Sequence, residues 1–482
     1  MATKKDLVEA YSFSRRRLVT AFVSGAPGGR EVEPTRPGRT IIGGLALAVL
    51  LAAGAAIAGV FSPRTPDDWT SNGLIVSKET GQAYVILPEA DGSPPAPGEP
   101  VELRPVINIT SAKLILGAGV EPMLISQDTI DDQLVGDDIG ILGAPASLPA
   151  PEMLVETGWT ACTADGRGMR VRVAVDPDVQ PAPEAGQVVR VDDAYYLIAS
   201  EHVGDQPPAA HVLRLPDRAA ADYLLGDLGL QARVLAPTVP RGWLDLFPAG
   251  APLDWSSFGL SGAGERPAEW DAAGVPARAR VGDVLTDAAE HAVLLTADGP
   301  ADLDPFAFAV YAYSSIPGHR DPLVIPVPTL PDLAKTRLPL GDAHWPTAAP
   351  QQTATAPCAV LVTDSDAAAI VQLAQSPGEG YAAADVGPDQ ADVTVDPGRG
   401  AYVLSASQEG ARTPLPVAID AKGRANPLDG DETAALLGYD GYPVPVVPDS
   451  WVKLFGAGVP LSQNLALCPP APAGEQDGPS CD

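Results

Sequence analysis

The sequence predicts an α+β protein with a single membrane span and a strand-rich exported domain of about four small α+β repeats around a central part. Three observations support this class. A 22-residue segment without any charged residue interrupts a chain of 482 residues. Proline (52 residues) and glycine (48 residues) favour short strands and turns over long helices. Several sequence patterns recur along the chain, which is typical of repeat folds.

The N-terminal segment, residues 1–39, is predicted to form a cytoplasmic amphipathic helix over residues 4–24 followed by a linker rich in Gly, Pro, Glu and Arg. Apolar residues recur there at helical spacing, namely Leu7, Val8, Tyr11, Leu18 and Phe22. Two interpretations remain open: the helix lies on the inner leaflet, bound through its arginines, or it docks a cytoplasmic partner. For the docking interpretation, the predicted contact residues are Tyr11, Phe13, Arg15, Arg16 and Arg17.

Residues 40–61, TIIGGLALAVLLAAGAAIAGVF, are the predicted transmembrane helix. As a helix they would be about 33 Å long, which is enough to cross a bilayer. A cleaved signal peptide has a shorter apolar run close to the N-terminus, whereas 39 residues precede this one. Eight basic and four acidic residues lie before the segment. Because basic residues beside a span stay in the cytoplasm, the N-terminus is predicted to be inside and residues 62–482 outside.

The exported part carries 23 basic and 57 acidic residues, a net charge of −34. Such a surface repels nucleic acid and anionic lipid headgroups, so we expect no nucleic-acid partner.

A strand, turn, strand pattern begins at Gly73, Gly186, Gly282 and Ala391. In each case apolar and polar residues alternate on both sides of an acidic or glycine-containing turn, as in a hairpin with one buried face. The sequence therefore predicts four repeat units, near residues 72–120, 185–260, 280–335 and 390–465.

The later half of a unit recurs as DYLLGDLGL from Asp222 and as AALLGYDGYPVP from Ala434, and AKLILGAG near residue 115 resembles both. Behind the first two follow WLDLFPAGAPLD (243–254) and WVKLFGAGVPLS (451–462), which agree at seven positions. The aromatic residues of these two corners would line either a ligand groove or a core, and their i, i+4 spacing favours the core. They are Trp243, Phe247, Trp451 and Phe455.

All four cysteines lie in the exported part, where disulfides persist, and four cysteines allow three pairings. Cys162 and Cys358 each end a non-repeat segment at the edge of a predicted strand. We infer that these segments, near residues 121–180 and 340–365, meet in a central part joined by a Cys162–Cys358 disulfide. Closing so long a loop would stabilise the fold by about 5 kcal/mol. Cys468 and Cys481 would then close a small loop in the Pro-rich tail, residues 466–482.

No motif for catalysis or cofactor binding is present. Lys422 is followed by a single glycine and lacks the Gly-rich loop that cradles phosphates, and Gly259–Ala263 lacks the final glycine of a nucleophile elbow. The acidic pairs, such as Asp192-Asp193, lack the ligand spacing of a calcium loop and suit solvated turns. The five histidines never occur at i, i+3 or i, i+4 spacing and are predicted to lie on surfaces or loops; they are His202, His211, His291, His319 and His344. We therefore expect no catalytic residue, no cofactor and no metal site.

Taken together, these segments resemble the EccB family, a membrane subunit of the type VII (ESX) secretion machinery of actinobacteria. The resemblance rests on YSFSRRRLVTAF, the single span, DWTSNGLIVSKETGQAYVI, LRPVINITSAKLILG, IGILGAPASLP, GWTAC and APCAV. It implies a short cytoplasmic segment, one transmembrane helix and a large periplasmic domain in which four repeats surround a central β-sheet. The repeat fold of the family is similar to the cell-wall-binding subunit of a phage lysin. The family's central disulfide corresponds to Cys162 and Cys358, whereas Cys468 and Cys481 have no counterpart in the family.

The resemblance also implies partners. Members of the family lie in a core complex with EccC, the motor ATPase, and with EccD and EccE, and they form dimers and rings on the outer face of the inner membrane. Some members have been described as ATPases, an activity for which this sequence offers no phosphate-binding loop. The expected function is a non-enzymatic scaffold that links the cytoplasmic motor to a periplasmic assembly. The alternatives are a peptidoglycan-binding membrane-anchored module and a periplasmic hydrolase, the latter requiring a buried triad.

Overall fold

The computed structural model of the chain describes residues 3–24, 69–87, 100–177, 179–201, 207–216, 218–315, 321, 323–352, 356–364, 367–375, 381–407, 413–430 and 432–471. The chain divides into two units, Met1–Pro66 and Asp67–Asp482, which are considered separately. Among the described residues, no helix combines the length and the apolar character needed to cross a membrane. The predicted span, residues 40–61, lies outside them.

The first unit contains helix α1 (Lys4–Ser24), which has the predicted bounds. Thr3 and Asp6 stabilise the start of this helix by hydrogen bonds in both directions. The backbone N–H and the hydroxyl of Thr3 donate to Asp6 Oδ2 at 2.9 and 2.7 Å, and the N–H of Asp6 donates to the carbonyl of Thr3 at 3.0 Å. These bonds satisfy donors that a helix start leaves unpaired. They also lower the pKa of the Asp6 carboxyl.

The second unit contains four small sheets that share one plan, and each is called here a sheet unit. In the first sheet unit, three antiparallel strands are followed by a helix and then by a strand that returns parallel to the first strand. These elements are β1 (Leu74–Ser77), β2 (Ala83–Ile86), β3 (Glu102–Val106), α3 (Ile109–Leu116) and β4 (Met123–Ile125). The helix α4 (Gln127–Asp131) and the edge strand β5 (Leu134–Val135) complete it, and the strand order is β4-β1-β2-β3-β5.

The third and fourth sheet units repeat this plan with the same strand pairing. The third contains β12 (Val284–Thr286), β13 (Ala292–Thr296), β14 (Gly299–Leu303), α7 (Pro305–Ala312) and β15 (Val324–Pro326). The fourth contains β20 (Ala401–Ala406), β21 (Leu415–Ile419), β22 (Arg424–Pro427), α8 (Thr433–Leu436), β23 (Val446–Pro448), α9 (Asp449–Val452), β24 (Gly456–Ala457) and α10 (Gln463–Ala466).

The second sheet unit is completed by a strand from elsewhere in the chain. It contains β9 (Ala185–Val191), β10 (Ala194–Glu201), β11 (Ala209–Arg214), α5 (Arg218–Asp227) and α6 (Arg241–Leu244). Thr238 forms a single parallel bridge with Arg190 where the other sheet units have their returning strand. The neighbouring part of β9 pairs with β16 (Gln351–Gln352), which follows the third sheet unit in sequence.

Side-chain caps fix where α3 and α7 begin. Asn108 accepts from the N–H of Ser111 at 2.8 Å and starts α3, and Asp304 accepts from the N–H of Ala307 at 2.7 Å and starts α7. Pro305 occupies the first position of α7, where its fixed φ suits a helix and no N–H is needed. Both helices therefore begin directly after the third strand of their sheet unit.

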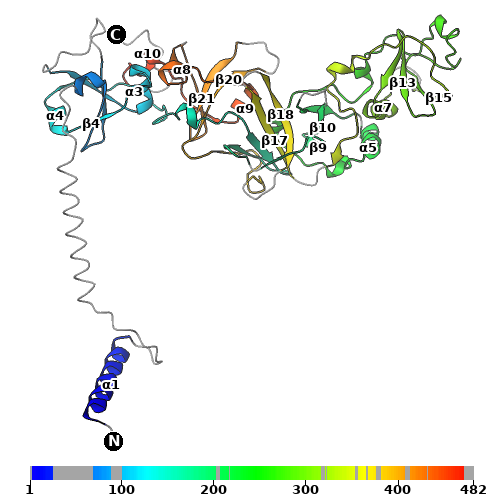
Figure 1. Ribbon diagram of the computed structural model, residues 1–482. Coiled ribbons are helices and arrows are strands. Elements are labelled where there is room, and N and C mark those ends of the chain that lie inside the picture. The colour runs from blue at the N-terminus through cyan, green and yellow to red at the C-terminus, as the bar shows by residue number, and fades with distance from the viewer. Residues whose placement is uncertain are drawn as a thin grey trace. The chain divides into compact units, whose positions relative to one another are not determined.

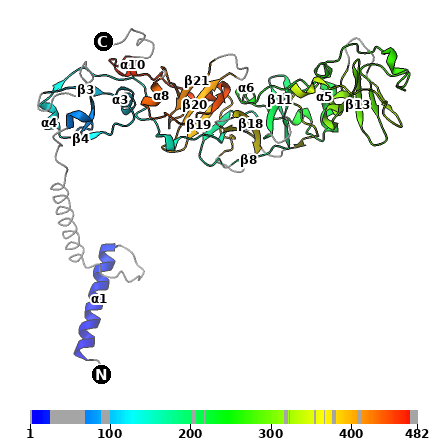
Figure 2. The ribbon, with the colours of Figure 1, turned by 45° about the horizontal axis from the view of Figure 1, so that its top comes forward.

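A six-stranded central sheet lies between the second and fourth sheet units. Its strands are β6 (Trp159–Thr163), β7 (Met169–Val173), β8 (Gln180–Pro181), β17 (Pro357–Asp364), β18 (Ala367–Gln375) and β19 (Ala391–Val395). The order is β19-β7-β6-β17-β18-β8, so β19 and β8 form its edges (Figure 2). Strand β18 contacts β10 and β11 of the second sheet unit and β23 of the fourth, and Figure 1 shows β18 between the labelled strands β10 and β20.

The order of the sheet units in space differs from their order in sequence. Helix α3 of the first sheet unit contacts α8 and α10 of the fourth, and α5 of the second contacts α7 of the third. The largest apolar core joins the central sheet to both of its neighbours, and it includes Trp159, Trp243, Trp451, Leu361 and Leu373. The central sheet is therefore the place where the two halves of the fold meet.

The hairpin predicted from Ala391 is wrong. Both halves of the pattern are strands, but β19 pairs in parallel with β7 of the central sheet, whereas β20 pairs with β21 and β23. The hairpin of the fourth sheet unit is β20–β21. The intervening turn, Asp396 to Gly400, carries the chain from one sheet to the next.

Candidate functional site

Helix α1 presents an apolar face that no described residue covers. At about 100° per residue, Leu7, Tyr11, Leu18 and Phe22 lie within about 60° of one another around the helix axis. Their side chains are strongly exposed, from 66% for Leu7 to 93% for Phe22. An exposed apolar stripe of this kind is a contact surface for a partner or a membrane.

The five predicted contact residues are divided between two sides of α1. Tyr11 belongs to the apolar face, and Arg15 lies about 40° from it. Phe13 lies about 160° from Tyr11, and Arg16 and Arg17 also point away from the apolar face by the same periodicity. Phe13 is 56% exposed and therefore is a separate apolar position on the opposite side. The prediction of partner contacts at these residues stays a prediction, and the helix geometry divides it into two testable faces.

The predicted disulfide between Cys162 and Cys358 is present and joins neighbouring strands of the central sheet. The two cysteines stand opposite each other in the antiparallel pairing of β6 with β17, and both are buried. They are 196 residues apart in sequence. Cys481 lies outside the described residues, so its pairing with Cys468 stays a prediction.

The duplicated corners are parts of the core and not a ligand groove. Trp243 and Trp451 are fully buried, and Phe247 and Phe455 are nearly so. Trp243 Nε1 donates to the carbonyl oxygen of Ala161 in β6 at 2.8 Å. The second and fourth sheet units thus use the same corner to pack against the same central sheet.

The route of the chain explains why the corner occurs twice. In the second sheet unit it connects Thr238, beside β9, to Ala249, beside β11. In the fourth it connects β23, beside β20, to β24, beside β22. In each case the chain crosses from one side of the sheet to the other. The short helix that contains the tryptophan, α6 or α9, lies within this crossing segment.

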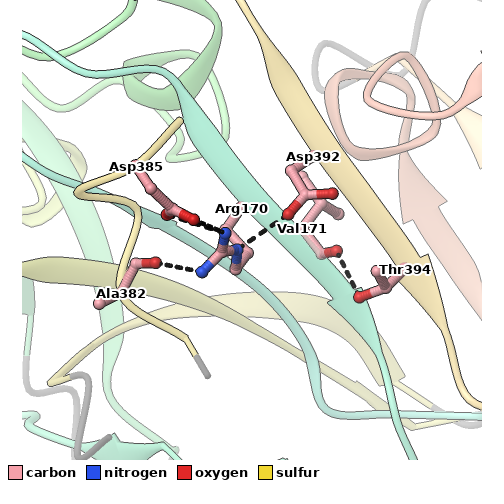
Figure 3. A network of polar contacts seen from close by, with 6 residues as sticks. All are labelled: Arg170, Val171, Ala382, Asp385, Asp392 and Thr394. Carbon is pink, nitrogen blue, oxygen red and sulfur yellow. Dashed lines mark hydrogen bonds and ion pairs between the residues drawn. The ribbon is translucent and has the colours of Figure 1, made fainter. Parts of the chain in front are cut away.

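A polar network fastens a loop to the central sheet near its β19 edge (Figure 3). Arg170 in β7 donates to Asp385 and to the carbonyl of Ala382 in the preceding loop, and to Asp392 in β19. Arg172 lies over the ring of Tyr381, with 4.7 Å from its guanidinium carbon to the ring centroid. These contacts fix the segment through which the chain enters β19.

The structure brings two of the five histidines together. His211 is buried in β11, which corrects the prediction of a surface or loop position, and His344 lies in the loop after the turn at Pro339–Asp342. Their rings stack, with 4.3 Å between the centroids and 3° between the planes. His344 Nδ1 lies 2.6 Å from Glu201 Oε2. Burial, followed by the nearby His344, lowers the pKa of His211 to about 4.

Sequence reasoning missed this cluster because it tested only helical spacing. Glu201, at the end of β10, and His344 are 143 residues apart, and strand pairing places Glu201 beside Ala209, two residues before His211. Of the other histidines, His291 is exposed beside Asp287 and the remaining two, at 202 and 319, lie outside the described residues. The one signal in the sequence was local, since His211 falls among apolar residues, Ala209, Ala210, Val212 and Leu213, in β11.

The family model described as "Type VII secretion system ESX-1, transport TM domain B" matches residues 1–470. The chain belongs to the EccB family. This match includes α1, all four sheet units and the central sheet.

Curated relatives carry the names of ESX systems. The chain is 26% identical over 478 residues to a protein of Mycolicibacterium smegmatis named "ESX-3 secretion system ATPase EccB3", covering 90% of this chain and 85% of that protein. It is 26% identical to "ESX-1 secretion system ATPase EccB1" of another strain of that species and 25% identical to the same-named protein of Mycobacterium tuberculosis. Against these two EccB1 proteins the chain spans 59% and 65% of their length.

Two solved structures share the fold. One is titled "Structure of EccB3 dimer from the ESX-3 core complex", with a TM-score of 0.57 and 21% identity, covering 82% of this chain and all of that one. The other is titled "Structure of an intact ESX-5 inner membrane complex", with a TM-score of 0.58 and 20% identity, covering 97% and 95%. The fold of these structures therefore extends through the second unit of this chain, Asp67–Asp482.

Proposed function

We propose that this chain is a structural membrane subunit of a type VII (ESX) secretion core complex, which links a cytoplasmic motor ATPase to an oligomeric assembly outside the membrane. One observation carries the proposal: a single EccB family model matches residues 1–470 without division. The titles of the structures that share its fold name an inner membrane complex and a dimer, which supports assembly as the role.

The proposed topology assigns one role to each segment. Residues 1–39 lie in the cytoplasm, residues 40–61 cross the inner membrane once, and residues 62–482 form the periplasmic domain. The partners are an EccC-type motor ATPase, EccD and EccE, with homodimers joined into rings. The exposed apolar face of α1 supports a contact on the cytoplasmic side.

The proposed chemistry is contact and not catalysis. The curated relatives have "ATPase" in their names, but this sequence has no Gly-rich loop ending in Lys-Ser or Lys-Thr to cradle phosphates. The peptidoglycan-binding alternative is favoured less, because it needs solvent-facing aromatic grooves and the corner aromatics Trp243 and Trp451 are fully buried.

The test is gentle detergent extraction of the tagged full chain from its native host, followed by mass determination and identification of the proteins that accompany it. We expect a large complex that contains an FtsK-like ATPase. A variant lacking residues 3–24 keeps Arg30, Arg36 and Arg39 beside the proposed span. It should stay in the membrane and lose the ATPase.

Two further results would contradict the proposal. One is recovery of the chain alone on peptidoglycan fragments, which would favour the wall-binding alternative. The other is nucleotide hydrolysis by the purified chain that persists after the motor ATPase is removed, because a scaffold has no such activity.

A further inference from the structure

The loop that carries His344 is fixed against the second sheet unit. The N–H of Ala251 donates to the carbonyl of Ala343 at 2.9 Å, and Trp345 Nε1 donates to the carbonyl of Ala251 at 3.0 Å. Between these anchors, His344 has a φ of 55°, in the left-handed region that non-glycine residues rarely adopt. The fold thus accepts an unfavourable backbone conformation at the residue that places an imidazole over His211.

The hydrogen-bond partners determine which ring nitrogens are available. His211 Nδ1 lies 3.2 Å from the carbonyl oxygen of Ala209, which can only accept, so Nδ1 carries the proton. His344 Nδ1 faces the Glu201 carboxylate in the same way. In the neutral form of each ring, the lone pair is then on Nε2. Histidines that bind metals show this arrangement, with one nitrogen donating to a carbonyl or carboxylate and the other on the metal.

We propose that the Nε2 atoms of His211 and His344 bind one divalent transition-metal ion, with zinc as the expected ion and Glu201 as the residue that positions His344. Imidazole pairs suit zinc, nickel and copper, whereas calcium and magnesium prefer oxygen ligands. Among the described residues, Glu201, His211 and His344 form the one group in which three side chains able to bind a metal each place a ring nitrogen or a carboxylate oxygen within 4.8 Å of the others.

Binding requires a small local movement. Two ligands of a tetrahedral zinc ion lie about 3.3 Å apart, given bonds of about 2.05 Å, so the stacked rings have to turn toward a common point. The side chain of His344 is 41% exposed, whereas His211 is buried, so the ring of His344 is the one that turns. Water or a partner side chain completes the coordination.

Metal binding here would fasten the segment that returns from the third sheet unit onto the second. That segment continues into β16, which completes the sheet of the second sheet unit. This role is independent of the proposed function in secretion, and it predicts a metal-dependent stability.

The experiment uses the full chain in detergent, with an affinity tag that lacks histidine and after removal of bound metal by a chelator. Zinc titration by calorimetry should give one ion per chain and should raise the melting temperature. Cobalt(II) should give the visible absorption bands of a low-symmetry site. His344→Ala should weaken zinc binding by at least about 100-fold, and Glu201→Gln by about 10-fold at an unchanged metal-free melting temperature.

The matched control is His291→Ala, which removes an exposed histidine that also has a carboxylate neighbour, Asp287. It should bind zinc like the unchanged chain. The proposal is overturned if the unchanged chain binds no zinc, or if His344→Ala binds it as tightly as His291→Ala does.

Discussion

Phe455 packs edge-on against Trp159, with 5.3 Å between the ring centroids and 80° between the planes. Trp159 belongs to β6 of the central sheet, and Phe455 belongs to the duplicated corner of the fourth sheet unit. Phe455 is therefore a direct contact between the fourth sheet unit and the central sheet.

The duplication supplies an internal control for one hydrogen bond. Trp243 and Trp451 are both fully buried at equivalent positions, but Trp243 Nε1 donates to Ala161, whereas Trp451 Nε1 has no hydrogen-bond partner among the described residues. Trp243→Phe should therefore destabilise the fold more than Trp451→Phe, by about 0.5–1.5 kcal/mol. Thermal unfolding of the two purified variants measures this difference, and equal melting temperatures would contradict it.

Removal of the central disulfide should lower the free energy of unfolding more than truncation of any single side chain does. In the chain-entropy model, a crosslink between residues 196 apart restricts the unfolded chain by about 5 kcal/mol. The Cys162→Ala/Cys358→Ala variant should melt at a lower temperature than the unchanged chain, and reductant should lower the melting temperature of the unchanged chain alone. If the unchanged chain and the variant melt together, the disulfide does not stabilise the fold.

The two sides of α1 can be separated by matched substitutions. Leu18→Glu places a charge on the apolar face, whereas Phe13→Glu places the same charge on the opposite side. We expect Leu18→Glu to abolish co-purification of the motor ATPase and Phe13→Glu to retain it. The reverse result would assign the docking surface to Phe13.

A helix that only rests on lipid gives a different pattern. Leu18→Glu would then reduce binding of the isolated helix to anionic vesicles and leave co-purification of the ATPase unchanged. Both readouts on the same variant distinguish the two interpretations that the sequence leaves open.

The network around Arg170 predicts a dependence on acid pH. The hydrogen bond from Arg170 lowers the pKa of the Asp385 carboxyl from its ordinary value of 3.8. A carboxyl with a lower pKa in the folded state stabilises the fold above its unfolded pKa, and that contribution is lost as the pH falls through the folded pKa. Below about pH 4, the melting temperature of the unchanged chain should therefore fall more steeply than that of Arg170→Met.

The control for this pH effect is Arg241→Met, which removes an exposed i, i+4 ion pair with Asp245. Such pairs contribute little to stability. Its pH profile should run parallel to that of the unchanged chain, and a parallel profile for Arg170→Met would contradict the prediction.

Local patterns were sufficient where structure is local. The alternation after Gly73, Gly186 and Gly282 predicted three of the four hairpins, because both strands and their turn lie within about 16 residues of one another. The helical spacing of apolar residues over residues 4–24 predicted α1 with its observed bounds. The buried state of the corner aromatics also followed from i, i+4 spacing.

Apart from the Cys162–Cys358 disulfide, pairing over long distances was beyond the sequence. Residues 391–395 resemble the first half of a hairpin, yet they pair with β7, which is more than 200 residues earlier. The same limit concealed Glu201, His211 and His344, because only the folded sheet brings them together. Alternation of apolar and polar residues predicts that one face of a strand is buried, but it does not predict which other strand or helix that face packs against.

Under the topology proposed above, the order in which the chain leaves the cytoplasm has a consequence for how the domain matures. Strands β6 and β17 are neighbours in the central sheet, but residues 164–356 separate them in sequence. During export from the N-terminus, β6 therefore emerges long before its partner and exposes an unpaired apolar edge. An export-stalled chain that ends before residue 357 would have a complete first sheet unit and an open centre, which makes it the form most prone to aggregation and proteolysis.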